Sequence, residues 1–513
     1  MPDVVTNYVS IDGEMEVEEV VQVARKGKKA YLSLDLKEKI RKSRQTVEDI
    51  IAENRIVYGI NTGFGKFCEV SISAEKCREL QRNLICSHAA GVGPPFSEEV
   101  VRAIMLLRIN ALSLGHSGIR EEVLNLLLEM LNRGVHPVIP SQGSLGASGD
   151  LAPLSHMALV MIGEGEAYFQ GSRLPGEEAL KAAELEPVEL QEKEGLALIN
   201  GTQVMTALGS LAWYDAINLS KAADMIGALT MEALKARWEP FNQLNYKIRP
   251  HFGYGATLRN INKMVKGSAN LGSDQTKTQD AYSIRCLPQV HGASKDALNY
   301  IKGVLAIEIN SVTDNPLVFP EENTVISAGN FHGQPVGLAM DFFATALAEL
   351  GSISERRLER LLNSNLSGLP PFLTTEGGLS SGYMIAQYTA ASLVSENKVY
   401  SHPASVDSLP VSASQEDHVS MGTNAARKAC NVVTNVAYIL AAEYLAAAQG
   451  LDLSDNLGLG EGSRCVYRKL RDRIPYLQQD RLIYPELEKV ASMLKEGELV
   501  QENEVGRGIF LEG

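Results

Sequence analysis

The chain has 513 residues, 48 of them basic and 62 acidic, and carries a formal net charge of −14 at pH 7. This negative balance opposes phosphate backbones and anionic membrane surfaces, so we expect neither nucleic acid nor a membrane among its partners. With 45% hydrophobic residues and an acidic first segment that lacks the features of a secretory signal, the chain is expected to be a cytoplasmic protein with a large core.

Complete helix signals mark the N-terminal part of the chain. Residues 36–54 show helical periodicity. In the next signal, Ser97 is a suitable N-cap, Glu98 follows at the positive end of the helix dipole, and Gly115 ends the pattern. A further signal of this kind ends at Gly134. We therefore expect a helix in each of these three stretches.

Longer helical patterns follow at residues 203–236, 336–363 and 421–449. Several of these helices are apolar or rich in alanine on nearly every face, so they need neighbours all round. The last pattern contains a run that approaches the length of a membrane span, but polar residues, Glu443 among them, interrupt it, which favours a helix buried inside the protein. The patterns predict a central bundle of long helices shared between subunits.

Strand-like sequence is sparse. The clearest stretch is "NPLVFPEENTVIS" at residues 315–327, where two short β-prone runs flank a turn and predict a small hairpin. The predicted fold class is therefore mostly α, with a long-helix bundle and a smaller N-terminal region that carries the loops of the candidate site. We place the boundary softly at residue 205, between a region of residues 1–205 and a helical region of residues 206–513.

Phosphate-binding and metal-binding motifs are absent. The loop "YGINTGFGK", residues 58–66, would need glycine at Ile60 and serine or threonine at Phe67 to bind a phosphate as a Walker A loop does. It is either a tight, movable loop with Tyr58 at its base or an ordinary surface loop. The six cysteines show no C-x-x-C spacing and the nine histidines no H-x-x-x-H pair, so we expect free thiols and no metal.

The tripeptide Ala147-Ser148-Gly149 can react with itself. If the chain is bent sharply, the amide nitrogen of Gly149 can attack the carbonyl carbon of Ala147 and close a ring. Loss of water from that adduct and from the side chain of Ser148 leaves an exocyclic methylidene, an electrophile that no unmodified side chain provides. Taken alone, however, an Ala-Ser-Gly tripeptide is common and is better interpreted as a simple structural turn, so the case for this chemistry must come from the surrounding motifs.

The motifs around this tripeptide resemble those of the aromatic amino acid ammonia-lyase and aminomutase family. The resemblance covers nearly the whole chain, in family order. Its motifs are "YGINTGFG", "SHAAGVG", "GSLGASGDLAPLSHM", "LINGTQ", "QDAYSIRC", "TDNPL", "GNFHGQPV" and "SQEDHVSMG".

Membership implies a prosthetic group, 4-methylidene-imidazole-5-one (MIO), formed autocatalytically from Ala147, Ser148 and Gly149 with no external cofactor. It also implies a homotetramer whose active sites combine residues from more than one subunit. The motifs most resemble those of the histidine-directed lyases, which convert L-histidine to trans-urocanate and ammonia. The electrophile is attacked by either the substrate amine or the imidazole ring, and the sequence leaves both routes open.

The resemblance also implies roles for individual catalytic and binding residues. Tyr58 is the expected general base for the β-proton, and Arg285 is expected to hold the substrate carboxylate through two parallel hydrogen bonds. Asn200 would donate toward the prosthetic carbonyl or the carboxylate. The remaining family positions lie beside the prosthetic group, where Phe331 excludes water: Gln279, Tyr282 and Phe331.

Substrate choice is expected to rest on His88 and Glu416. On the helical pattern alone, His88 is a core histidine at the end of an apolar stripe. Family members that act on tyrosine or phenylalanine carry His-Leu or Phe-Leu at the positions of Ser87 and His88, and Asn-Gln-Asp around Glu416. A carboxylate can accept an imidazole N–H but would be left unpaired against a phenyl ring. Asp417 and His418 either orient Glu416 or form a plain polar loop.

Alternatives to a histidine lyase come from two classes. An aminomutase, or a lyase for another aromatic amino acid, would use the same electrophile, and a mutase acting on histidine would keep both His88 and Glu416. A non-catalytic helical scaffold would be expected to lose Ser148 or Tyr58, and this chain has both. The sequence therefore predicts a carbon–nitrogen lyase, with His291 left unassigned.

Overall fold

The computed structural model describes residues 7–63, 72 and 74–513, so Gly65 and Phe67 of the glycine-rich loop and Cys68 lie outside the described residues. Contacts divide the chain into two compact units. The first unit contains residues 1–211, 303–341 and 403–427, and the second contains residues 212–302, 342–402 and 428–513. The domain boundary at residue 205 stays a prediction, because both units are discontinuous in the chain.

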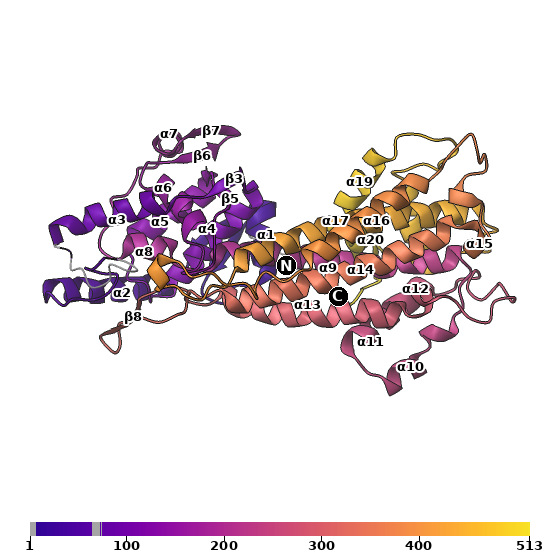
Figure 1. The fold of residues 1–513 in the computed structure, drawn as a ribbon, viewed down its shortest axis with the longest axis horizontal. Coiled ribbons are helices and arrows are strands. Elements are labelled where there is room, and N and C mark those ends of the chain that lie inside the picture. Colours follow the sequence, from indigo (N-terminus) through magenta and orange to yellow (C-terminus); the bar gives the residue numbers. More distant parts are fainter. Residues whose placement is uncertain (1–6, 64–71, 73) are drawn as a thin grey trace, which may run out of the picture. The chain divides into compact units, whose positions relative to one another are not determined.

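Helices form most of the first unit (Figure 1). In α4 every residue from Val100 to Ser113 is buried, and α1, α2 and α5 pack against it. The predicted start at Ser97 and the predicted stop at Gly134 are confirmed as the N-cap of α4 and the left-handed C-cap of α5. The helices are α1 (Val17–Lys26), α2 (Leu34–Ala52), α3 (Ala74–His88), α4 (Glu98–Ser113), α5 (Glu121–Arg133), α6 (Leu151–Met161), α7 (Gly176–Ala182) and α8 (Glu194–Ile199).

Four small sheets accompany these helices. The predicted hairpin is confirmed as the antiparallel pair β8 and β9, with Phe319 opposite Thr324. The other sheets join strands that the sequence analysis did not single out: parallel β1–β2, antiparallel β3–β5 and antiparallel β4–β6–β7. The strands are β1 (Tyr8–Ile11), β2 (Lys29–Leu32), β3 (Val92–Pro95), β4 (His136–Pro137), β5 (Pro140–Gln142), β6 (Glu166–Phe169), β7 (Ser172–Pro175), β8 (Leu317–Phe319) and β9 (Thr324–Ile326).

Four long helices each contribute residues to both units: α9 (Gln203–Ala233), α13 (Leu287–Ile309), α14 (Gln334–Leu362) and α17 (Gly422–Leu453). Three of them confirm the long helical patterns of the sequence. Both α14 and α17 are long and apolar enough to cross a membrane, but 61% and 72% of their most apolar windows are buried inside the protein. They are therefore helices of the protein core, as predicted for α17.

The second unit surrounds its parts of these long helices with shorter ones (Figure 1). The shorter helices are α10 (Gln243–Ile248), α11 (Phe252–Met264), α12 (Tyr282–Arg285), α15 (Ser364–Ser367), α16 (Met384–Tyr400), α18 (Glu461–Arg471), α19 (Tyr484–Lys495) and α20 (Glu498–Arg507).

A buried network of charged side chains joins the long helices inside the second unit. Arg357 of α14 donates to both carboxylate oxygens of Glu443 of α17, at 2.6 and 2.8 Å. His291 of α13 lies between Asp224 of α9, 2.8 Å from its Nδ1, and Arg357, 3.2 Å from its Nε2. These side chains are fully buried, so each charge depends on its partners for stabilisation.

This network predicts a pH dependence of stability that comes from His291. Burial lowers the pKa of His291, and Asp224 and the Arg357 and Lys295 cations act on it as well, with a net lowering. Below the ordinary histidine pKa of about 6.5, the unfolded chain takes up a proton that folded His291 resists, so stability falls as the pH falls. Urea unfolding at several pH values should show that the free energy of unfolding falls less with decreasing pH in His291→Gln than in the unaltered protein. Glutamine keeps a donor and an acceptor but does not titrate.

An unchanged pH dependence in His291→Gln would contradict this account of the network.

Candidate active site

The loop between β5 and α6 is held in a sharp bend at Gly149. Gly149 has φ +72°, and a Cβ there would lie 2.2 Å from the carbonyl oxygen of Gly201. The next amide, that of Asp150, donates to the same carbonyl at 2.7 Å. No side chain fits between these backbones, so the tripeptide requires glycine at this position.

The carboxylate of Asp150 ties this loop to the longest helices. Its Oδ2 accepts the amides of Val204 and Met205, both at 3.0 Å, in the first turn of α9. Its Oδ1 accepts the hydroxyls of Ser144, at 2.7 Å, and of Thr423, in the first turn of α17. Burial raises the pKa of Asp150, and these hydrogen bonds act in the opposite direction. Because Asp150 is also the N-cap of α6, the positive ends of three helices meet at this loop.

A cavity of about 1190 Å³ opens beside the bent loop. All of its lining residues belong to the first unit. Six residues singled out from the sequence lie together in its wall: Tyr58, His88, Ser148, Asn200, Phe331 and Glu416. Its size suits a ligand of small-molecule dimensions.

Ser148 is contacted from two sides of the cavity. Its hydroxyl donates to Oε1 of Glu416 at 3.2 Å, and its carbonyl accepts Nδ2 of Asn200 at 3.0 Å. Asn200 lies at the C-terminal end of α8, where its buried Oδ1 has no hydrogen-bond partner among the described residues. The side chain therefore keeps an acceptor atom for a ligand.

His88 presents a defined face to the cavity from the end of α3. Its Nδ1 lies 2.9 Å from the carbonyl oxygen of Leu84, and because a carbonyl only accepts, Nδ1 carries the proton. Burial lowers the pKa of His88, although the Leu84 carbonyl and Glu416 oppose this effect. The ring is therefore neutral at pH 7, and Nε2 offers a lone pair. The reading of His88 as a core histidine is wrong: Cys77 on the same helix is buried, but His88 lines the cavity.

Glu416 is carried by a strained loop. Backbone hydrogen bonds join Val411 and Glu416 in both directions, at 2.9 and 3.3 Å. Between them Ser412, Ala413 and Ser414 have φ of 52°, 54° and 64°, a conformation that costs non-glycine residues about 1–3 kcal/mol each. Nothing in the sequence pattern signals this strain, and its position beside a cavity is typical of functional loops.

Further residues of the wall were not singled out from the sequence. Asn315 lies at the edge of the β8–β9 hairpin, where its Oδ1 accepts the amide of Ala328 at 2.8 Å and the hydroxyl of Ser327 at 3.2 Å. The side-chain nitrogen Nδ2 of Asn315 therefore remains as the hydrogen-bond donor of this side chain. The motif "TDNPL" contains this residue and was the available signal.

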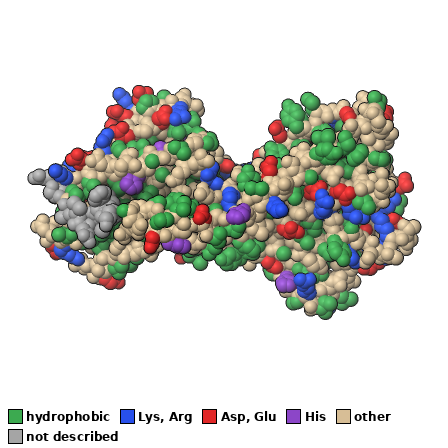
Figure 2. Space-filling view, viewed as in Figure 1, with side chains coloured by type: hydrophobic (Ala, Val, Ile, Leu, Met, Phe, Trp, Pro, Cys, Tyr) green, Lys and Arg blue, Asp and Glu red, His purple; other side chains and the backbone are tan. Residues whose placement is uncertain are grey.

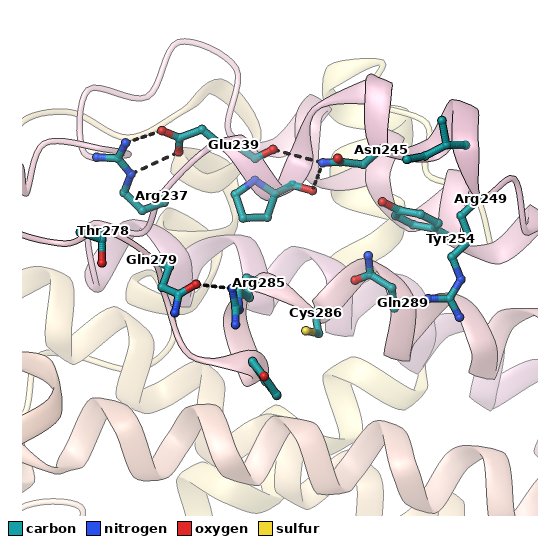
Figure 3. A pocket seen from close by; sticks show the side chains of 13 residues that line it. Arg237, Glu239, Asn245, Arg249, Tyr254, Thr278, Gln279, Arg285, Cys286 and Gln289 are labelled. Atoms are coloured by element: carbon teal, nitrogen blue, oxygen red, sulfur yellow. Dashed lines mark hydrogen bonds and ion pairs between the residues drawn. The ribbon is translucent and has the colours of Figure 1, made fainter.

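Gln279, Tyr282 and Arg285 lie elsewhere, in the second unit, and are not in the wall of this cavity. They line another pocket, of about 720 Å³, shown in Figure 3. There Nη1 of Arg285 donates to Oε1 of Gln279 at 2.5 Å, and the guanidinium lies 4.7 Å from the centre of the Tyr282 ring. Tyr282 is 68% exposed. The resemblance places these side chains beside the tripeptide in sites shared between subunits, and that placement stays a prediction.

No group of three or more metal-ligating side chains occurs among the described residues, and the described cysteines form no disulfide.

Comparison with known proteins gives consistent relatives. Residues 15–472 match the sequence model of the family described as aromatic amino acid lyase. The chain is 56% identical over 495 residues to the histidine ammonia-lyase of Alkaliphilus oremlandii, covering 96% of this chain and 98% of the relative. It is 53% identical over 493 residues to the histidine ammonia-lyase of Clostridium tetani, covering 95% and 96%.

Solved structures agree with these relatives. Histidine ammonia-lyase from Trypanosoma cruzi has a TM-score of 0.92 at 42% identity, covering 98% of this chain and 96% of that one. Tyrosine aminomutase from Streptomyces globisporus has a TM-score of 0.94 at 41% identity, covering 98% and 100%.

Proposed function

Because the chain belongs to the aromatic amino acid lyase family, we propose that it removes ammonia from L-histidine to give trans-urocanate. Relatives named histidine ammonia-lyase share more than half of its residues over nearly its whole length. The observation that carries the proposal is the cavity wall, where Ser148 of the self-reactive tripeptide lies with His88 and Glu416. These are the residues expected for an electrophile and for recognition of an imidazole ring.

The family depends on MIO, and the loop fits its formation from residues 147–149. Gly149 is pressed against Gly201, Ala147 is small and buried, and Asn200 donates to the carbonyl of Ser148. The group supplies an electrophilic carbon for covalent catalysis. We therefore propose that Gly201, Asp150 and Asn200 hold it, and that no external cofactor is needed.

His88 and Glu416 suit an imidazole ring by hydrogen bonding. Nε2 of neutral His88 and the carboxylate of Glu416 are both acceptors, and either can accept the single N–H of a neutral imidazole ring. A phenyl ring would satisfy neither acceptor and would leave a carboxylate without a partner in the site, so the pocket disfavours phenylalanine. Recognition therefore works by rejection as well as by binding.

Tyr58 and Phe331 are the other two residues of the first unit that the proposed chemistry uses. Tyr58 lines the cavity, and its phenolic oxygen is the proposed base that takes the β-proton of the substrate. Phe331 lines the same cavity and would exclude water from the reacting atoms. Both residues belong to the same unit as the rest of the cavity wall.

A second copy of the chain would supply the remaining residues. Gln279, Tyr282 and Arg285 lie outside the cavity of their own chain, yet a carboxylate substrate requires a cation such as Arg285. Figure 2 shows hydrophobic side chains on the exposed surface of the second unit, a feature typical of subunit interfaces. Large exposed examples are Tyr300, Phe342, Ile385, Tyr388 and Val399. We therefore propose a homotetramer with shared sites, located in the cytoplasm.

The substrate prediction is tested by incubating the protein separately with L-histidine, L-tyrosine and L-phenylalanine. Ammonia and an unsaturated acid should appear in equal amounts from histidine alone. The control Ser148→Ala should be at least about a thousandfold slower, because it cannot form the electrophile. Release of a β-amino acid in place of ammonia would show an aminomutase. Equal turnover of phenylalanine would contradict the roles of His88 and Glu416.

The shared site predicts complementation between inactive variants. Tyr58→Phe and Arg285→Ala should each have little activity alone. When the two chains are co-expressed, about a quarter of the sites should combine an intact Tyr58 from one copy with an intact Arg285 from another. Activity should recover in that proportion. No recovery in mixed tetramers verified by mass spectrometry would place both residues in a site built from one chain.

A further inference from the structure

Two histidines that the proposed function does not use face each other next to the cavity. One of them, His418, is the residue for which the sequence left open a role in orienting Glu416. His332 directly follows Phe331, and His418 lies just after Glu416. Their rings are stacked almost in parallel, with centroids 5.8 Å apart and an angle of 7° between the planes. Nε2 of His332 also lies 3.3 Å from the backbone carbonyl oxygen of His418. We call these residues the histidine pair.

The contacts of the histidine pair act on both the side chain and the backbone of His418. A carbonyl oxygen only accepts hydrogen bonds, so Nε2 of His332 carries the proton and donates it. The offset ring contact adds an attraction of the kind found between aromatic side chains. Together they attach the segment after Glu416 to the segment that carries Phe331.

The loop that carries Glu416 needs such an attachment. Its turn contains consecutive residues in the left-handed conformation, and the paired backbone of Val411 and Glu416 closes the turn upon itself. A strained loop of this kind keeps its geometry only when surrounding contacts hold it. The carboxylate of Glu416 must nevertheless stay near the tripeptide, where it lies 3.2 Å from the hydroxyl of Ser148.

The start of α14 holds the other side of the same segment. Gln334 donates to the carbonyl of Ser405 at 3.0 Å, and Asp341 accepts the amides of Ala404 and Ser405 at 2.8 and 2.7 Å. The region from His332 to Asp341 therefore contacts the chain both before and after the Glu416 loop. On the far side of the loop, the histidine pair joins this region to His418, next to the place where Gly333 and Gly337 pack closely against Ser420.

We propose that His332 and His418 are positioning residues that hold the Glu416 carboxylate where it meets the ring of the substrate. The inference rests on the proposed function, because it assumes that Glu416 recognises that ring. The histidine pair touches neither the tripeptide nor, on this proposal, the substrate, and it acts through Glu416 alone.

The test compares His332→Ala and His418→Ala with the unaltered protein. Each change should raise KM for L-histidine about ten-fold with a smaller change in kcat, because a displaced carboxylate weakens ring binding. The KM of the double variant should be no higher than that of the more impaired single variant, since both changes break the same attachment. His418→Phe should restore much of the affinity, because it keeps a stacking ring and the backbone carbonyl.

The matched control is His116→Ala. His116 makes the same kinds of contact, with Nδ1 2.9 Å from the carbonyl oxygen of Val318 and a ring 5.2 Å from that of Phe319, but it does not line the cavity. Its loss should lower thermal stability and leave KM unchanged. A comparable rise in KM in His116→Ala would overturn the proposal, because any lost histidine contact would then have the same effect.

The decisive comparison uses the Glu416→Gln background. If the histidine pair acts through Glu416, His332→Ala should cause no further rise in KM there, and an undiminished rise would overturn the proposal. Calorimetric binding of trans-urocanate gives a second readout that does not depend on turnover. A protein that binds urocanate without releasing ammonia from histidine would contradict the proposed function. In that case a higher Kd for urocanate in His332→Ala would still support the positioning role. An unchanged Kd would refute the positioning role.

Discussion

The carboxylate of Asp150 lies where the N-termini of three helices meet, and the candidate site depends on this meeting point. The same side chain accepts amides from the first turn of α9 and a hydroxyl from the first turn of α17, while its own residue caps α6. A buried carboxylate is unfavourable unless it is hydrogen-bonded, and here the donors are two otherwise unpaired amides at the start of α9 and the hydroxyls of Ser144 and Thr423. One interaction thus fixes the starting points of two long helices and the bend of the reactive loop.

The bend gives the chemistry its location. Because Gly149 is pressed against Gly201, the tripeptide is held in a compact conformation, and the side chain of Ser148 faces the cavity. The helix ends around the loop favour negative charge, which suits a group that must accept electrons. The residues proposed to recognise the substrate come from different elements, the end of α3 and the strained loop of Glu416. On the proposed function, reactivity and selectivity are set by separate parts of the first unit.

Local signals allowed the helices to be predicted from the sequence. Caps and 3.6-residue periodicity act over a few residues, so α4, α5 and the hairpin β8–β9 were found close to their actual bounds. The pairs β1–β2 and β3–β5 were missed because their strands are very short and find their partners across intervening helices. The strained turn before Glu416 was also missed, since serine and alanine do not signal a left-handed conformation.

In the site, too, local features could be predicted from the sequence and contacts between distant residues could not. The tripeptide of Ser148 suggested a self-reaction, and the family motifs around it decided between that reaction and a simple turn. The contact between Ser148 and Glu416 joins residues 268 positions apart, and no local pattern could have indicated it. Their association came from the family resemblance, and the structure gives it a physical form. The resemblance also grouped Arg285 with these residues; in the structure Arg285 lines a pocket of the second unit, and its place beside the tripeptide of another subunit stays a prediction.

The most direct test of this account is the intact mass of Asp150→Ala, compared with the unaltered protein and with the exposed variant Asp35→Ala. The account predicts that the unaltered chain and Asp35→Ala lack the mass of the water lost when the ring forms, localised to the peptide that contains residues 147–149. Folded Asp150→Ala, identified by a cooperative unfolding transition, should retain that mass. Full loss of water in folded Asp150→Ala would contradict the claim that this carboxylate holds the loop in its reactive bend.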